Sequence, residues 1–146
     1  MLLFKKKFIE LIKKGEKTQT IRLWRHCQLR PGQRSYIPGI GYIAILSVEP
    51  VEINALTDAD AKPDGFSSAK LLRKELQKIY ASEIKRGHKA YRVCFSVYPP
   101  EVQQSMREEK AQKKAAMKQA EYKQRMQDAD DHVKRTLVKL KQIAET

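Results

Sequence analysis

A sharp change in glycine and proline content divides this chain and limits its possible folds. Residues 1–100 contain every glycine and proline of the sequence, whereas residues 101–146 contain neither. Gln, Lys, Glu, Ala and Met dominate the second part, and all are good helix formers. We therefore expect a compact domain at residues 1–98 and a charged, mostly helical C-terminal extension at residues 99–146, separated at Pro99-Pro100.

Two helices are predicted in the first part. Apolar residues recur at helical spacing from Phe4 to Ile12, and Gly15 fits the left-handed position that follows a last helical turn. A second apolar helical face follows a plausible N-cap at Ser68 and ends near Gly87. Between the helices, residues 57–67 are polar and indicate a loop.

The rest of this part predicts strands. Alternating or continuous apolar patterns are found at residues 18–24, 36–37, 42–48 and 91–97. Pro50 indicates a bulge or an edge position. Because the strands do not alternate regularly with helices, the pattern favours an α+β fold with a small closed or partly closed sheet over a doubly wound fold.

Positive charge is concentrated in the predicted domain. Of the net charge of +13, residues 1–98 contribute +10, from nineteen basic and nine acidic side chains, and residues 99–146 contribute +3, from eleven and eight. Such a domain favours a nucleic acid as partner, ahead of an anionic membrane surface. The alternative is a charge that serves solubility only.

No pattern in the sequence predicts a metal or a cofactor. Cys27 and Cys94 lack metal-ligand spacing, and Gly39 and Gly41 lack the strand-loop-helix setting of a phosphate loop. The start of the chain has no signal-peptide pattern, and no apolar stretch is long enough to span a bilayer. We expect a cytoplasmic protein that does not enter a membrane.

The segment Gly15-x-Lys17-x-x-Thr20-x-Arg22 predicts a binding site. It brings an amine, a hydroxyl and a guanidinium together where residues 1–34 hold ten basic side chains and two acidic ones, a setting that attracts phosphates. In a regular strand Lys17 and Thr20 would face opposite ways. For both to enter one cleft, Lys17 must lie in the turn after Gly15.

Two further residues are candidates for contact with RNA. Trp24 shares a strand face with Thr20 and Arg22, where it could stack on a base, although burial in a core is the more common fate of a tryptophan. Arg25 follows directly. The expected ligand-binding set is therefore Lys17, Thr20, Arg22, Trp24 and Arg25.

This motif resembles the signature of the ASCH domain, a family related to the PUA domains of RNA-modifying proteins. The family pattern is Gly-x-Lys-x-x-Glu-x-Arg, and Thr20 stands here in place of the glutamate. The resemblance covers about residues 1–98. It implies a PUA-like β-barrel with flanking helices, and a cleft lined by Lys17 and Arg22 that binds RNA or a nucleotide-like ligand.

The run Lys17-Thr18-x-Thr20-Ile21-Arg22 is also similar to that of the bacterial acetylcytidine amidohydrolases, a subgroup of this family. The similarity implies a catalytic lysine, threonine and glutamate. Lys17, as the nucleophile, and Thr20 would take the first two roles. In the loop before the second helix Asp64 would take the third, with Asp58 and Asp60 as alternatives. A lysine attacks an acyl carbon only as the neutral amine, which burial or Arg22 would favour.

The C-terminal extension has a weak apolar stripe in its second half. The stripe consists of Tyr122, Met126, Ala129, Val133, Leu137 and Leu140. It could dock on the domain, pair with another chain or lie beside RNA, or the helix could remain solvated. Three hypotheses follow in order of preference: an RNA- or nucleotide-binding protein, an amidohydrolase, and an adaptor that recruits a partner through this helix.

Overall fold

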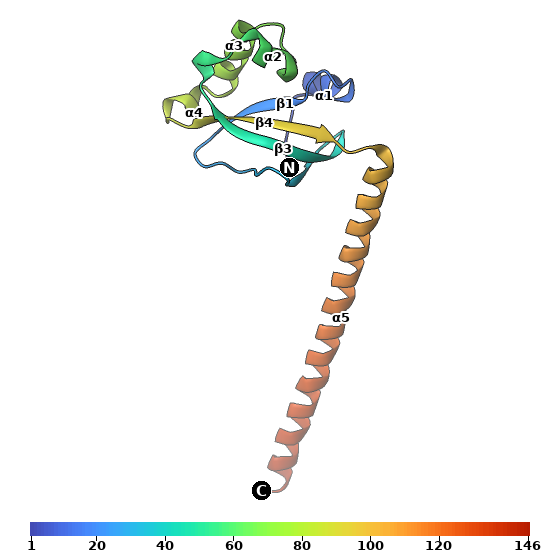
Figure 1. The fold of residues 1–146 in the computed structure, drawn as a ribbon. Helices are drawn as coiled ribbons and strands as arrows, with labels where there is room; N and C mark the ends of the chain where they lie inside the picture. Colours follow the sequence, from blue (N-terminus) through green and yellow to red (C-terminus); the bar gives the residue numbers. More distant parts are fainter. The chain divides into compact units, whose positions relative to one another are not determined.

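The computed structural model describes residues 1–146, which form two compact units, Met1–Gln103 and Gln104–Thr146. The first unit contains four antiparallel strands, β1 (Gln19–Trp24), β2 (Arg34–Ile37), β3 (Gly41–Val51) and β4 (Lys89–Val97). Their order in the sheet is β1-β4-β3-β2, and the sheet curls into a half-barrel (Figure 1). The predicted α+β class, with a small, partly closed sheet, flanking helices and a long C-terminal helix, is confirmed.

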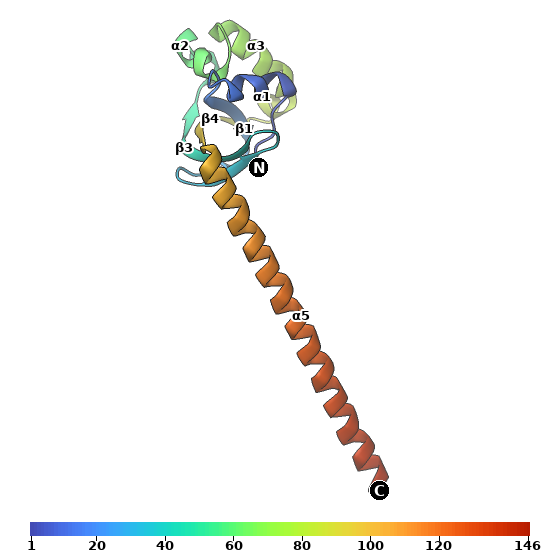
Figure 2. The same ribbon diagram turned by 90° about the vertical axis from the view of Figure 1, so that its right-hand side faces the viewer.

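Short helices pack against both faces of this sheet. They are α1 (Lys6–Lys13), α2 (Asp58–Ala61), α3 (Ala69–Ile79) and α4 (Ala81–Lys85), with the 3-10 turns η1 (Ile53–Ala55) and η2 (Lys62–Asp64). α1 packs on the face of Val93 and Phe95, whereas α2 and α3 pack on the face of Ile21 and Leu23. All three helices lie near β1 (Figures 1 and 2). This arrangement surrounds the edge of β1 with helical segments.

Two sequence predictions for residues 57–87 need correction. The helix expected from Ser68 to Gly87 is two helices, because Tyr80 has a non-helical backbone (φ −112°, ψ 26°) between α3 and α4. The N-cap is as predicted: the hydroxyl of Ser68 accepts a hydrogen bond from the backbone N–H of Leu71 at 3.3 Å. The loop expected at residues 57–67 contains α2 and η2, since Thr57 and Asp60 form a capping box that begins a helical turn.

Pro50 lies inside β3 and has an edge position there. Residues Gly41–Ala44 of β3 pair with β2, whereas Pro50 pairs only with Tyr91 of β4. The missing N–H of the proline therefore removes no ladder hydrogen bond. The irregularity in β3 lies earlier, between Ile45 and Ser47.

The core consists of two apolar clusters, one for each face of the sheet. The cluster on the concave face contains Leu2, Ile12, Leu29, Ile37, Ile43, Ile45, Val93 and Phe95. The cluster beneath α2 and α3 contains Ile21, Leu23, Leu56, Ala61, Leu72, Leu76 and Ala90. The alternation of β1 separates Ile21 and Leu23 from Thr20 and Arg22, as the sequence predicts.

The C-terminal extension is one helix, α5 (Pro100–Ala144), of 45 residues. Its first turn belongs to the first unit. Gln103, which is only 6% exposed, connects this turn to the sheet by hydrogen bonds. The Gln103 carbonyl accepts a hydrogen bond from Tyr42 N–H at 2.7 Å, and the Gln103 amide donates to the carbonyls of Tyr42 at 2.8 Å and Tyr98 at 3.1 Å. These bonds satisfy backbone groups at the start of β3 and the end of β4.

No helix in the structure combines the length and the apolar character that crossing a bilayer would require.

We predict that Gln103→Ala lowers the free energy of unfolding by about 2 kcal/mol, because it leaves the partly buried backbone N–H of Tyr42 without a partner and removes one hydrogen bond each from the carbonyls of Tyr42 and Tyr98. Urea denaturation followed by circular dichroism measures this loss. Gln104→Ala is the matched control, since Gln104 is exposed and bonds only to Glu108 of its own helix. Equal midpoints for the two variants would contradict the role given to Gln103.

Candidate functional site

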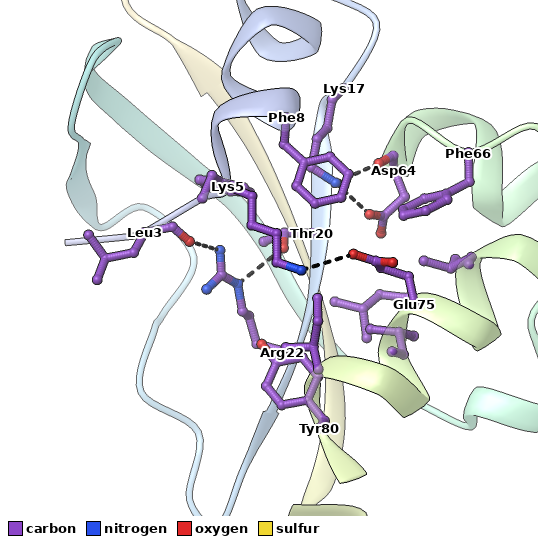
Figure 3. Close-up of a pocket in the computed structure, with 15 residues that line it drawn as sticks. Leu3, Lys5, Phe8, Lys17, Thr20, Arg22, Asp64, Phe66, Glu75 and Tyr80 are labelled. Carbon is purple, nitrogen blue, oxygen red and sulfur yellow. Dashed lines mark hydrogen bonds and ion pairs between the residues drawn. The ribbon is translucent and has the colours of Figure 1, made fainter.

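A pocket lies at the outer edge of β1, the strand that has a sheet partner on one side only. The N-terminal segment, α1, η2 and α3 enclose it, as the close-up shows (Figure 3). Its cavity measures about 140 Å³. The lining residues are Leu3, Phe4, Lys5, Phe8, Lys17, Thr20, Ile21, Arg22, Asp64, Phe66, Leu72, Glu75, Leu76, Ile79 and Tyr80.

Gly15 directs Lys17 into this pocket. It follows α1 with φ +78°, and the N–H groups of Gly15 and Glu16 bond to the carbonyls of Ile12 and Leu11 at 3.0 Å each. This pattern is the Schellman motif, in which a left-handed glycine reverses the chain after a helix. Lys17 consequently precedes β1, and its side chain lines the same pocket as Thr20. Lys17 thus lies in the turn after Gly15, as it must for Lys17 and Thr20 to enter one cleft.

A second left-handed glycine brings Asp64 to the same place. Gly65 ends η2 with φ +89°, and a Cβ built on it would lie 2.9 Å from the Leu11 side chain. Glycine suits this position because of its left-handed backbone, and the absence of a side chain leaves room for the methyl group of Leu11 in α1. The N–H of Thr18 bonds to the Pro63 carbonyl at 2.8 Å, which aligns η2 with the start of β1.

Lys17 and Asp64 form a buried ion pair at the base of the pocket. The Lys17 ammonium donates to Asp64 Oδ1 and to the Asp64 carbonyl, both at 2.5 Å, and the two side chains are only 3% and 4% exposed. Gln19 donates to the second carboxylate oxygen at 3.2 Å and to the Asp60 carbonyl at 2.8 Å. The pair is thus held by hydrogen bonds on both partners, as a buried ion pair requires.

The surroundings of Lys17 disfavour its charged form. Burial lowers the pKa of the Lys17 amine below its usual value; Asp64 acts against this shift, and the nearby Arg22 guanidinium adds to it. Phe8 partly compensates, since its ring centroid lies 4.7 Å from the ammonium, a cation–π distance. Phe4 and Phe66 lie at 5.8 and 5.9 Å.

Arg22 and Thr20 occupy the side of the pocket beside the N-terminal segment. Arg22 donates from Nε to the Thr20 hydroxyl at 3.1 Å and from Nη2 to the Leu3 carbonyl at 2.7 Å (Figure 3). Its guanidinium also lies over the Phe4 ring, 4.7 Å from the centroid. Burial lowers the pKa of Arg22, whereas the phenol of Tyr80 and the Asp64 carboxylate raise it; guanidinium nevertheless stays charged in proteins.

Glu75 lies at the mouth of the pocket and connects α3 with the N-terminal segment. Its Oε1 pairs with the ammonium groups of Lys5 at 3.3 Å and Lys7 at 3.1 Å, and the Glu75 side chain is 14% exposed. Burial raises the pKa of Glu75, but the two lysines lower it by more, so the net shift is downward. A carboxylate is therefore fixed beside the cavity opening.

The structure gathers some of the predicted site residues and separates others. Lys17, Thr20, Arg22 and Asp64 line one pocket. The two alternative carboxylates do not line it: Asp58 accepts from Ala69 N–H at 2.7 Å, and Asp60 caps α2 and pairs with Arg92 at 3.1 Å.

Trp24 and Arg25 also lie outside the pocket lining. The indole of Trp24 is half-buried against the concave core, with its ring centroid 5.7 Å from that of Tyr91. Arg25 is exposed. A contact of either residue with RNA would therefore be separate from the pocket.

Sequence reasoning missed three polar residues of the site. Gln19 was treated as the variable position of the motif, yet it bonds to Asp64. Glu75 carried a signal, because it lies on the same helical face as Leu72 and Ile79 and interrupts an apolar stripe. No sequence signal indicated that Tyr80 would line the pocket, since its position depends on the break between α3 and α4.

Comparison with solved structures shows which fold this is. The chain is similar to the hypothetical protein PH0355 (18% identity, TM-score 0.57, 66% of this chain and 95% of that one). It is also similar to EF3133 from Enterococcus faecalis V583, of the family DUF984, with 16% identity, a TM-score of 0.54, and coverage of 63% of this chain and 67% of that one. A third similar structure is an ASCH domain from Lactobacillus crispatus JV V101, with 19% identity, a TM-score of 0.53, and coverage of 61% of this chain and 69% of that one. At these identities the likeness establishes a fold.

No family model and no curated protein sequence matches the chain. Within the structure, no group of three His, Cys, Asp or Glu side chains is placed to hold a metal ion.

We predict that Asp64→Ala lowers the free energy of unfolding by about 3 kcal/mol, because it leaves the Lys17 ammonium buried without a carboxylate. Chemical denaturation measures the loss. The double variant Lys17→Met/Asp64→Ala should recover at least half of it, since no charge then remains buried. If Asp64→Ala unfolded at the wild-type denaturant concentration, the ion pair would have no structural importance.

Proposed function

We propose that this chain, which has the fold of the ASCH domain, binds a nucleotide, free or within RNA, by taking the base into the pocket beside β1. The observation that carries the proposal is the convergence of Lys17, Thr20, Arg22 and Asp64 on one aromatic-walled cavity. Ligand sites typically combine apolar walls with a few convergent polar groups and perturbed pKa values.

The size of the cavity favours a single base over a whole nucleotide. At about 140 Å³ it is smaller than the pockets of 300–1,000 Å³ typical of drug-sized ligands. Phe4, Phe8 and Phe66 supply flat apolar surfaces on which a base can stack. The ribose and phosphate would remain at the mouth, in the field of a domain whose net charge is +10.

Arg22 is the best-placed recognition residue. Arg22 donates to Thr20 and Leu3 and also lies beside the phenol of Tyr80, and the proposal assigns the N–H groups that remain of its five to a base oxygen or a phosphate. Lys17 differs, because its ammonium already bonds twice to Asp64 and is almost fully buried. The proposal therefore gives Lys17 the task of fixing the pocket floor, and gives direct contact with the ligand to Arg22 and Thr20.

We predict that Arg22→Gln weakens nucleotide binding at least 10-fold, whereas Arg25→Gln weakens it less than about 2-fold. Both variants remove one positive charge, but only Arg22 lines the pocket. Calorimetric titration with cytidine and uridine monophosphates, and with a short single-stranded RNA, measures the effect, after thermal melting has shown that both variants are folded. Equal losses would mean that the general field of the domain, and no pocket, binds the ligand.

The second candidate is an amidohydrolase that acts on acetylcytidine or a related acylated nucleoside. The observation that favours it is that the burial of Lys17 lowers the pKa of its amine beside both a carboxylate and a hydroxyl. Neutral amine is the form that can act as nucleophile or base.

The reaction can be written with these groups alone. The Lys17 amine would attack the acyl carbon and pass its proton to Asp64, while Arg22 and Thr20 face the oxygen that becomes negative. The bond from the acyl carbon to the nucleoside nitrogen would then break, and that nitrogen would take the proton. Water must finally cleave the acyl-lysine. Because this intermediate is itself an amide, the last step is the more demanding one.

For this candidate we predict that the rate of acetylcytidine turnover rises with pH and levels off once the pH exceeds the lowered pKa of Lys17, since only the neutral amine reacts. Lys17→Ala should reduce kcat at least about 10³-fold, a loss typical of a removed catalytic group. Liquid chromatography of cytidine release measures both. No turnover at high enzyme concentration, at any pH where the protein is folded, would eliminate the enzyme and leave the binding proposal standing.

A further inference from the structure

The exposed surface of α5 carries a regular apolar pattern. From residue 107 to residue 144 every side chain is exposed except the half-exposed Asp131. Large apolar side chains in this range are more than half exposed, among them Tyr122 at 64%, Leu137 at 60% and Leu140 at 57%. The α5 stripe, as we define it, consists of Ala111, Ala115, Tyr122, Met126, Ala129, Val133, Leu137, Leu140 and Ala144.

The α5 stripe repeats every eleven residues. Three series of residues are spaced by eleven. The first is Ala111, Tyr122, Val133 and Ala144, and the second is Ala115, Met126 and Leu137. The third is Lys118, Ala129 and Leu140, in which Lys118 is polar and is not counted in the stripe. Eleven residues in three turns give about 3.67 residues per turn, close to the natural 3.6 of an α-helix. The stripe therefore stays on one side of a nearly straight helix over its whole length.

The sizes of the stripe residues are complementary when two copies run in opposite directions. If the two-fold axis passes between Gln127 and Asp128, Met126 faces Ala129 of the second copy, and Tyr122 faces Val133. By the same register Ala115 faces Leu140, and the long stem of Lys118 lies against Leu137. Tyr122, Met126 and Leu140 each meet a smaller side chain, which is the condition for close packing between facing positions. A parallel pair would instead place Tyr122 on Tyr122 and Ala129 on Ala129.

The charge of the paired segment opposes association, so the apolar and size complementarity of the α5 stripe must select the second copy. Residues 111–144 carry nine basic and four acidic side chains, a net charge of +5, which weakens pairing at low salt and is screened at physiological salt. In the antiparallel register Lys123 lies near Asp130 of the second copy, twice by symmetry. The starts of the two helices, each preceded by a segment of net charge +10, lie at opposite ends of the pair.

We propose that α5 is a dimerisation helix that pairs antiparallel with α5 of a second copy through the α5 stripe. Burial of the stripe on both helices would remove on the order of 1,200 Å² from water, about the lower limit for a specific interface. The expected dimer is therefore one of micromolar affinity. This inference does not depend on the pocket or on its ligand.

Sedimentation equilibrium of the full chain tests the pairing. Wild type should form a dimer at micromolar concentration, and Met126→Glu should raise the dissociation constant at least 10-fold. Met117→Glu is the matched control: Met117 is 66% exposed but lies on the opposite side of the helix from the stripe, so its dissociation constant should stay within about 2-fold of wild type. Circular dichroism confirms that both variants remain helical.

A distance measurement tests the direction. A spin label on Glu145→Cys, in a Cys27→Ser/Cys94→Ser background, should give a distance of about 50 Å between the two labels of an antiparallel pair, from the 1.5 Å rise per residue. A distance below about 20 Å would show a parallel pair and overturn the proposed register. A monomer or a trimer in sedimentation, or equal weakening by the two methionine variants, would overturn the proposal as a whole.

Discussion

The buried ion pair between Lys17 and Asp64 is the interaction on which the candidate site depends. It connects the turn after α1 to the 3-10 turn η2, two segments 47 residues apart in the sequence. Each partner arrives by way of a left-handed glycine, Gly15 for the lysine and Gly65 for the aspartate. An unpaired charge at 3% exposure would be costly, so loss of one partner alone would destabilise the packing of α1, β1 and η2.

The ion pair also determines what the other polar groups can do. Because Asp64 holds the Lys17 ammonium and Glu75 pairs with Lys5, the guanidinium of Arg22, which has five N–H donors, is the cation best placed to contact a ligand in the pocket. The N-terminal segment completes the site, since the Leu3 carbonyl fixes Arg22 and Lys5 pairs with Glu75 across the opening. A base-sized cavity with one oriented guanidinium suits recognition of a flat polar ring.

How much of this was available from the sequence differs from residue to residue. The alternation of residues 18–24 placed Thr20 and Arg22 on one face of a strand, and Gly15 placed Lys17 in a turn, because these features depend on local backbone geometry. The place of Gln19 depends on how η2 packs against β1, which no local pattern encodes, whereas Glu75 could have been found from its position in the apolar stripe of its helix. The break at Tyr80 was missed for a related reason: residues 68–86 have helical propensity throughout, and tertiary packing ends α3.

For the C-terminal part, the absence of Gly and Pro predicted a single helix, and α5 is that helix. Its apolar stripe was visible in the sequence as well, but the eleven-residue repeat has meaning only on a continuous helix.

The most direct test of the central claim is a titration of isotope-labelled protein with cytidine monophosphate, followed by NMR. The account predicts that the largest shifts occur at Thr20, Arg22, Phe66 and Tyr80, with little change at residues 50–54 on the far side of α3 or along α5. Shifts confined to exposed lysines, or spread evenly over the basic surface, would contradict a binding pocket beside β1.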